Sequence, residues 1–260
     1  MLKILRLAVL GMLMLVWFVL GLLLCLLRPR HRTNVYWLSC RMMHQACPLL
    51  GIKVRVIIPD ACRDLGPAVY VANHQTNWDI MVMTGAVRPG VVAVGKKSLL
   101  WLPLFGQLFY LSGNILIDRS NRSRAIDTIR QVVEKIRGQR LAIWMFPEGT
   151  RSLGRGLLPF KTGSFHTAMQ AGVPIVPIVA SSYAKQIDLN RWDNGEVVIE
   201  MLPPLDSTQW ERDQVRECSE QVRAIMKAKL QELDGRVRRP AGEVAVADGL
   251  APEQSNQHDA

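Results

Sequence analysis

The chain of 260 residues is long enough for one good-sized domain with a sizeable hydrophobic core, and its length does not require a second domain. Its 32 Lys and Arg residues against 22 Asp and Glu residues give a net charge of +10, which favours an anionic partner: a membrane surface, a phosphorylated substrate, an acidic carrier protein or nucleic acid. The odd number of cysteines, five, and the lack of a C-x-x-C pair argue against a full disulfide framework and favour a reduced, cytosol-facing domain.

A hydrophobic segment lies at the N-terminus. Leu7–Leu27 is a run of 21 uncharged, mostly large apolar residues, preceded by Lys3 and Arg6 and followed by a cluster of three arginines. As a helix it would be about 30 Å long, which matches the hydrocarbon core of a bilayer. A cleaved signal peptide is the alternative, but the run is long for one and no A-x-A-like site follows it before the arginines. We therefore predict a retained segment in the cell inner membrane, with the rest of the chain facing the cytoplasm.

A second apolar-rich stretch, Val35–Leu50, is interrupted by Arg41 and His44. Three arrangements fit this pattern: a helix in the membrane interface, the second arm of a hairpin, or a helix packed on the domain. Residues 1–50 are accordingly predicted to form an N-terminal membrane-associated helical segment, as an anchor or an interfacial segment.

After Gly51, short β-like runs alternate with helical stretches. The β-like runs are Ile52–Ile58, Ala68–Ala72, Val91–Gly95, Asn114–Ile117, Leu141–Met145, Ile175–Ala180 and Val197–Leu202. The clearest helix is Ser123–Arg137, whose apolar residues fall on one face. Strands and helices in alternation predict an α/β fold with a mixed, largely parallel sheet and helices on both of its faces.

The C-terminal part contains one more predicted helix. Gln209–Leu233 has the pattern of a charged amphipathic helix. Its expected apolar side consists of Val215, Val222, Ile225, Met226 and Leu230. Beyond Asp234 the sequence shows no periodicity, so we predict one domain over residues 51–233 and a disordered tail over residues 234–260.

Two polar loops follow predicted strands. Residues 73–79 read Asn-His-Gln-Thr-Asn-Trp-Asp, and residues 146–152 read Phe-Pro-Glu-Gly-Thr-Arg-Ser. Ligands of α/β sheets gather at the carboxyl ends of strands, where both loops would lie. His74 and Asp79 suit an imidazole base held by a carboxylate, and the Gly-Thr-Arg turn suits a phosphate. Together they indicate proton abstraction beside an anionic group.

Several other kinds of site are disfavoured by the sequence. Gly90–Lys96 matches the first seven positions of a phosphate loop, but Lys97 stands where Ser or Thr must bind magnesium, and the run itself is strand-like. No G-x-S-x-G motif occurs, so the sequence lacks the turn that presents a serine nucleophile. A reaction that transfers a group directly, without a covalent acyl-enzyme intermediate, is therefore the simpler mechanism. The five histidines show no metal-ligand spacing. We therefore expect neither a metal nor a cofactor.

Four segments together resemble a known family. In this order, Asn73–Asp79, Gly113–Arg119, Phe146–Ser152 and Val173–Pro177 resemble the four sequence blocks of the glycerolipid acyltransferase family. Four ordered blocks are far more specific than any one of them, and the likeness spans about residues 50 to 205. The chain departs from the family at Thr76, where serine is frequent, but another small hydroxyl there puts little in doubt.

The resemblance implies a catalytic role for His74 and Asp79, which fall on the family's His-x4-Asp pair. A glycerol hydroxyl is too weakly acidic to attack unaided, so a neutral imidazole would remove its proton as the oxygen meets a thioester carbonyl. Asp79 would fix the tautomer of the ring and stabilise the imidazolium.

The resemblance also implies a site for the acceptor phosphate. Its expected residues are Arg119, Glu148, Gly149, Thr150 and Arg151. Arginine suits this role because its guanidinium forms bidentate hydrogen bonds with phosphate oxygens. For Arg119 the alternative is a solvated surface ion pair with Asp118.

The implied function is transfer of a fatty acyl group to the sn-2 hydroxyl of lysophosphatidate, giving phosphatidate. Residues 51–233 would then form the acyltransferase domain. Expected partners are lysophosphatidate, an acyl carrier protein or coenzyme A thioester, and membrane lipid, rather than the nucleic acid that charge alone would allow. Lys96–Tyr110, apolar after two lysines, fits part of an acyl-chain tunnel or membrane-facing surface, or equally a plain core helix. The alternative functions are acylation of another lysolipid and catalytically silent lipid binding.

Overall fold

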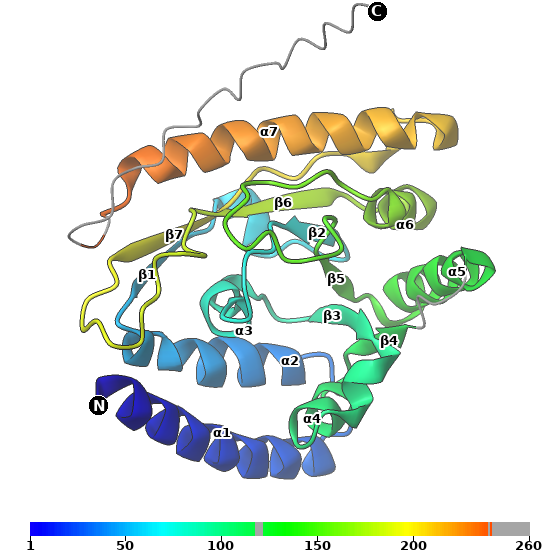
Figure 1. The fold of residues 1–260 in the computed structure, drawn as a ribbon. Coiled ribbons are helices and arrows are strands. Elements are labelled where there is room, and N and C mark those ends of the chain that lie inside the picture. The colour runs from blue at the N-terminus through cyan, green and yellow to red at the C-terminus, as the bar shows by residue number, and fades with distance from the viewer. Residues whose placement is uncertain (118–121, 239, 241–260) are drawn as a thin grey trace, which may run out of the picture.

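A computed structural model describes residues 1–117, 122–238 and 240 of the chain. Its centre is a seven-stranded sheet in the order β1-β7-β6-β2-β5-β3-β4 (Figure 1). The strands are β1 (Lys53–Ile57), β2 (Val69–Ala72), β3 (Val91–Lys96), β4 (Ile115–Ile117), β5 (Ala142–Met145), β6 (Ile175–Ala180) and β7 (Glu196–Met201). Only β6 and β7 pair antiparallel among these strands. The predicted mixed, largely parallel sheet is confirmed.

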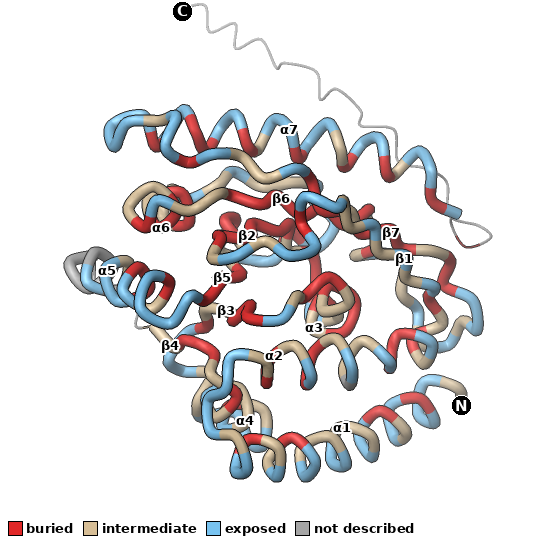
Figure 2. Tube along the Cα trace, turned by 180° about the vertical axis from the view of Figure 1, so that it is seen from behind, coloured by how far each residue is buried: buried red, intermediate tan, exposed pale blue. Residues whose placement is uncertain are grey.

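The burial of each strand follows from its place in the sheet. Every residue of the central strands β2 and β6 is buried, as expected for strands covered on both faces, and their sequences are nearly continuous apolar runs. The edge strand β1 alternates exposed and half-buried residues, with Lys53 and Arg55 outward. Figure 2 shows the buried residues concentrated where β2, β5 and β6 lie side by side.

Helices cover both faces of the sheet, as predicted. On one face lie α6 (Gly163–Ala171) and α7 (Val215–Arg236), with α5 (Arg122–Gln139) packed beside α6. On the other lies α3 (Asp79–Val82), followed by a short 3-10 turn and covered by the helical segment that precedes β1 (Figure 1). Gly90–Lys96 is not a phosphate loop, because residues 91–96 form β3.

The C-terminal helix differs from its predicted limits. The predicted first residues form short 3-10 turns, and α7 begins at Val215 and continues to Arg236. Ile225, expected on the apolar side, is 42% exposed, because the buried stripe instead repeats through Val222, Met226 and Leu230. The predicted tail lies mostly outside the described residues.

The N-terminal segment is a helical hairpin. Its first arm, α1 (Leu2–Leu27), is long and apolar enough to cross a membrane. The chain then reverses, and α2 (Asn34–Tyr36) continues through wider and then tighter helical turns to Leu50, antiparallel to α1 (Figure 1). This second arm also packs on α3 through buried residues such as Cys47. Val35–Leu50 is therefore both the hairpin arm and the domain-packed helix that the sequence allowed.

Arg6 attaches the first arm to the connection between β6 and β7. Its guanidinium is buried and donates to the main-chain oxygens of Leu189, Arg191 and Trp192 at 3.0, 2.6 and 3.2 Å. The same guanidinium lies 5.6 Å from the centroid of the Trp192 ring. Gly51 permits this approach, since a Cβ at its φ of +71° would collide with the main-chain oxygen of Trp192.

Replacing Arg6 by Ala is expected to lower the free energy of unfolding by about 2 kcal/mol, because three part-buried carbonyl groups lose the guanidinium that donates to them. For a domain of this size that corresponds to a fall in Tm of about 4–8 °C. Thermal unfolding of the detergent-solubilised protein measures it, with Lys3→Ala, which removes an exposed cation from the same helix, as the control. An equal fall in both variants would contradict a specific role for Arg6.

Candidate active site

The two polar loops meet at the carboxyl edge of the sheet. Because β2 and β5 are parallel neighbours, the segments that follow them leave the sheet side by side. The Ser152 N–H donates to the His74 oxygen at 2.8 Å, and the Leu153 N–H donates to the Gln75 oxygen at 3.0 Å. The meeting of the loops that the strand pattern predicted is thus confirmed.

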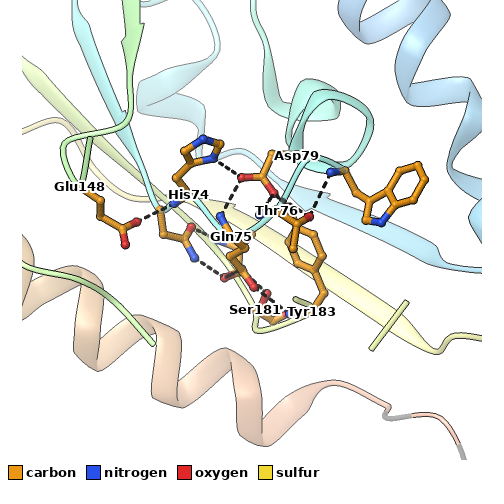
Figure 3. Close-up of polar contacts among 10 residues, drawn as sticks. His74, Gln75, Thr76, Asp79, Glu148, Ser181 and Tyr183 are labelled. Atoms are coloured by element: carbon orange, nitrogen blue, oxygen red, sulfur yellow. Dashed lines mark hydrogen bonds and ion pairs between the residues drawn. The ribbon is translucent and has the colours of Figure 1, made fainter. Parts of the chain in front are cut away.

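His74 and Asp79 form a close pair (Figure 3). The imidazole Nδ1 lies 2.6 Å from Oδ2 of Asp79, the first residue of α3. The Asp79 side chain is 4% exposed and the His74 side chain 23% exposed. With Nδ1 facing a carboxylate, the neutral ring carries its proton there and Nε2 holds a free electron pair. The pair thus has the arrangement of a base and the group that orients it.

Asp79 is held by more than the imidazole. Oδ2 accepts from the Gln75 N–H at 2.8 Å, and Oδ1 accepts from the Thr76 N–H at 2.9 Å and from the hydroxyl of Tyr183. The Thr76 hydroxyl accepts from the Trp78 N–H at 3.0 Å, a contact that serine would make equally well. A buried carboxylate is stable only with such compensation, so the loop is folded around it.

Glu148 connects the two loops by hydrogen bonds to the main chain. One carboxylate oxygen accepts from the His74 N–H at 2.6 Å and the other from the Leu158 N–H at 3.0 Å. Burial raises the pKa of Glu148 above its ordinary value, against the effect of these two donors, which favour the ionised form. Both oxygens are occupied, so Glu148 shapes the loops rather than presenting its charge to a ligand.

The Gly149-Thr150-Arg151 turn carries the cationic edge of the site. Gly149 has a φ of +71°, and a Cβ there would lie 2.9 Å from the side chain of Lys161, which crosses it. Arg155 donates to the main-chain oxygens of Ser152 and Arg151 at 2.8 and 3.1 Å. Lys161 and Arg155 were not singled out in the sequence, although both follow the Gly-Thr-Arg turn within ten residues.

A cavity of about 520 Å³ opens beside the pair. His74, Asp79 and the 149–151 turn line one part of it, and apolar side chains line the remainder. The apolar lining includes Val35 and Leu38 of the hairpin and Leu99, Phe105, Leu108 and Phe109 of the 97–111 segment. Trp101 in that segment is 80% exposed. The interpretation of Lys96–Tyr110 as a plain core helix is therefore wrong.

Two further residues at the cavity were named from the sequence only as parts of longer segments, without a role of their own. Phe146 stacks on the imidazole of His74, with ring centroids 4.1 Å apart and planes 16° apart, and so restrains the ring. Lys96 lines the cavity at the end of β3, opposite Ile117 of β4 in the sheet register. Asp118 and Arg119 follow Ile117 but lie outside the described residues, so the predicted role of Arg119 stays a prediction.

The site combines a carboxylate-held imidazole, cationic side chains and an apolar cavity. This combination is typical of enzymes that use a histidine base on an amphiphilic, anionic substrate. Comparison with known proteins narrows this class: residues 53–181 match the family model described as Acyltransferase.

Named relatives extend this match to most of the chain. The 1-acyl-sn-glycerol-3-phosphate acyltransferase of Escherichia coli is 50% identical over 87% of this chain and 93% of its own length. The enzyme of the same name from Haemophilus influenzae is 43% identical over 92% and 99%. The crystal structure of the 1-acyl-sn-glycerophosphate acyltransferase of Thermotoga maritima shares the fold, with a TM-score of 0.67, 24% identity, and coverage of 92% of this chain and all of that one. The chain belongs to the 1-acyl-sn-glycerol-3-phosphate acyltransferase family, which confirms the resemblance of its four blocks.

Exchange of Glu148 for Gln is expected to destabilise the junction of the two loops. The carboxamide nitrogen would face a backbone N–H, so a buried donor would lose its acceptor at a cost of about 2 kcal/mol in the free energy of unfolding. Chemical unfolding of this variant beside Glu134→Gln, which changes an exposed carboxylate on α5, measures the effect. Equal stability of the two variants would show that the Glu148 contacts contribute nothing.

Proposed function

We propose that the protein transfers a fatty acyl group from a thioester, carried by acyl carrier protein or coenzyme A, to the sn-2 hydroxyl of 1-acyl-glycerol-3-phosphate, giving phosphatidate. The observation that carries this proposal is the imidazole of His74, held by Asp79 at 2.6 Å, at the junction of a cationic turn and an apolar cavity. The names of the relatives support the choice of acceptor.

The transfer needs one base and no covalent enzyme intermediate. His74 Nε2 takes the proton of the sn-2 hydroxyl while the oxygen of that hydroxyl forms a bond to the thioester carbonyl carbon. The C–S bond then breaks, and the imidazolium returns the proton to the departing thiolate. Asp79 stabilises the imidazolium in between, since its carboxylate already contacts Nδ1. Phe146, stacked on the ring, keeps Nε2 directed at the substrate.

The cationic edge is the proposed site of the acceptor phosphate. Arg151 and Lys96 line the cavity, and Lys161 lies against the turn that carries Arg151. Arg119 completes the phosphate site in this proposal. Glu148 holds the loop, Gly149 allows the turn, and Thr150 lies between Gly149 and Arg151 at the cavity wall. A phosphate monoester with two negative charges matches such a cluster better than a neutral lysolipid.

The apolar parts of the molecule are the proposed contacts with lipid. The cavity lining from the hairpin and the 97–111 segment would receive acyl chain, and the exposed apolar side chains of α1, such as Leu15, Leu20 and Leu27, would enter the bilayer. The arginines after α1 would face the anionic leaflet on the cytoplasmic side of the inner membrane. Enzyme and acceptor would then share one surface.

Replacing His74 by Ala is expected to lower turnover by 10³-fold or more, since a general base contributes roughly 10²–10⁴-fold. The assay is transfer of labelled acyl group from a thioester to lysophosphatidate by membranes containing the protein, with exposed His31→Ala as control. Membrane association of both variants should match that of the unaltered protein. Unchanged turnover of His74→Ala would remove this residue from the mechanism, and absence of product from the unaltered protein would favour another acceptor or a binding role.

Replacing Arg151 by Ala is expected to raise the KM for lysophosphatidate about tenfold or more with a smaller effect on kcat, because a charge-assisted contact to the acceptor is lost. Arg130→Ala, which removes an exposed arginine of α5, serves as the control. The same assay with monoacylglycerol, which lacks the phosphate, should show no difference between Arg151→Ala and the unaltered protein. An equal loss with that acceptor would contradict a phosphate role.

A further inference from the structure

Tyr183 contributes a contact to Asp79 that comes from a distant part of the chain. Two donors to this carboxylate, the N–H groups of Gln75 and Thr76, belong to the same short loop as Asp79 itself. The hydroxyl of Tyr183 donates to Oδ1 from the connection between β6 and β7, 104 residues further along the chain. Figure 3 shows the phenol ring on the opposite side of the carboxylate from His74.

The tyrosine is itself fixed in place. Its main-chain N–H donates to Oε1 of Gln75 at 2.8 Å, and Nε2 of Gln75 donates to the Ser181 oxygen at 2.8 Å. The N–H and the hydroxyl of Ser182 each donate to a carboxylate oxygen of Asp234 at 2.6 Å. The segment Ser181–Tyr183 is therefore held on one side by the catalytic loop and on the other by α7.

The chemistry of the phenol suits a permanent donor. Tyr183 is 1% exposed, and burial together with the adjacent Asp79 carboxylate raises the pKa of Tyr183 well above its ordinary value. The hydroxyl thus keeps its proton while the imidazole gains and loses one. Because Oδ1 is held by Tyr183 and Oδ2 faces Nδ1, the carboxylate is prevented from rotating away from the ring.

We propose that Tyr183 is a positioning residue of the transfer reaction, which holds Asp79 so that His74 presents Nε2 in one orientation. This inference rests on the proposed function of the His74–Asp79 pair. Tyr183 is not expected to contact substrate, because its ring lies on the opposite side of the Asp79 carboxylate from His74 (Figure 3). Its removal should therefore affect the chemical step and leave both substrates bound as before.

The test is Tyr183→Phe, which removes the hydroxyl alone and retains the buried ring. Its kcat for phosphatidate formation is expected to fall about tenfold, with the KM values for both substrates within twofold of those of the unaltered protein. Tyr70→Phe is the matched control, because Tyr70 is also 1% exposed but lies in β2, stacked on Trp144. An unchanged kcat in Tyr183→Phe, or an equal fall in Tyr70→Phe, would overturn the proposal.

A second readout needs no turnover. The His74 Nδ1 proton, hydrogen-bonded to a carboxylate, should give a downfield proton NMR signal, assigned by its loss in His74→Ala. This signal should be sharp in the unaltered protein and in Tyr70→Phe, and shifted or broadened in Tyr183→Phe. If the unaltered protein makes no phosphatidate but Tyr183→Phe alters the signal, the positioning role stands and the proposed reaction fails. An unaltered signal in Tyr183→Phe would refute the positioning role.

Discussion

The buried negative charge of Asp79 is the constraint on which the site depends. A carboxylate at this depth must be surrounded by donors, and each donor fixes a different part of the molecule. The Gln75 and Thr76 amides fix the course of the loop, the contact with Nδ1 fixes the orientation of the His74 ring, and the Tyr183 hydroxyl connects the pair to the segment that follows β6. The His74 ring is held in one orientation because the buried Asp79 carboxylate needs this set of donors around it.

Charges of opposite sign are separated around the cavity. The carboxylates of Asp79 and Glu148 are both buried and accept hydrogen bonds from main-chain amides. Arg151, which lines the cavity, and Lys161, whose side chain lies against Gly149 of the same turn, are both exposed. In the proposed function, an anionic acceptor would meet the exposed cations of the turn, while both carboxylates are engaged by main-chain donors. In the proposed reaction, this separation would allow a base activated by a negative charge to operate beside a negatively charged substrate.

Much of the fold and the centre of the site could be predicted because both depend on local sequence. Seven β-like runs were recognisable from their own residues, and His74 and Asp79 lie within one turn that ends at a helix start. Tyr183 and Phe146 could not be found in this way, because their contacts with the pair arise only when β2 lies between β5 and β6. Ile225 was misplaced because its neighbour Met226 fits the same apolar spacing, and only packing on the sheet decides which of them is buried.

The attachment of Arg6 has a consequence for the order of events during synthesis. Its acceptors lie 183 to 186 residues later in the chain. At ribosomal rates of roughly 5–20 residues per second, the apolar helix emerges about ten to forty seconds before the carbonyl groups that will bind its arginine exist. During that interval α1 lacks this attachment, although the second arm of the hairpin and α4 (Phe105–Leu111), on which it also packs, have already been synthesised. If α1 enters the bilayer, as proposed, membrane contact would precede the attachment of Arg6, and the domain would complete its folding on a helix that the bilayer already holds.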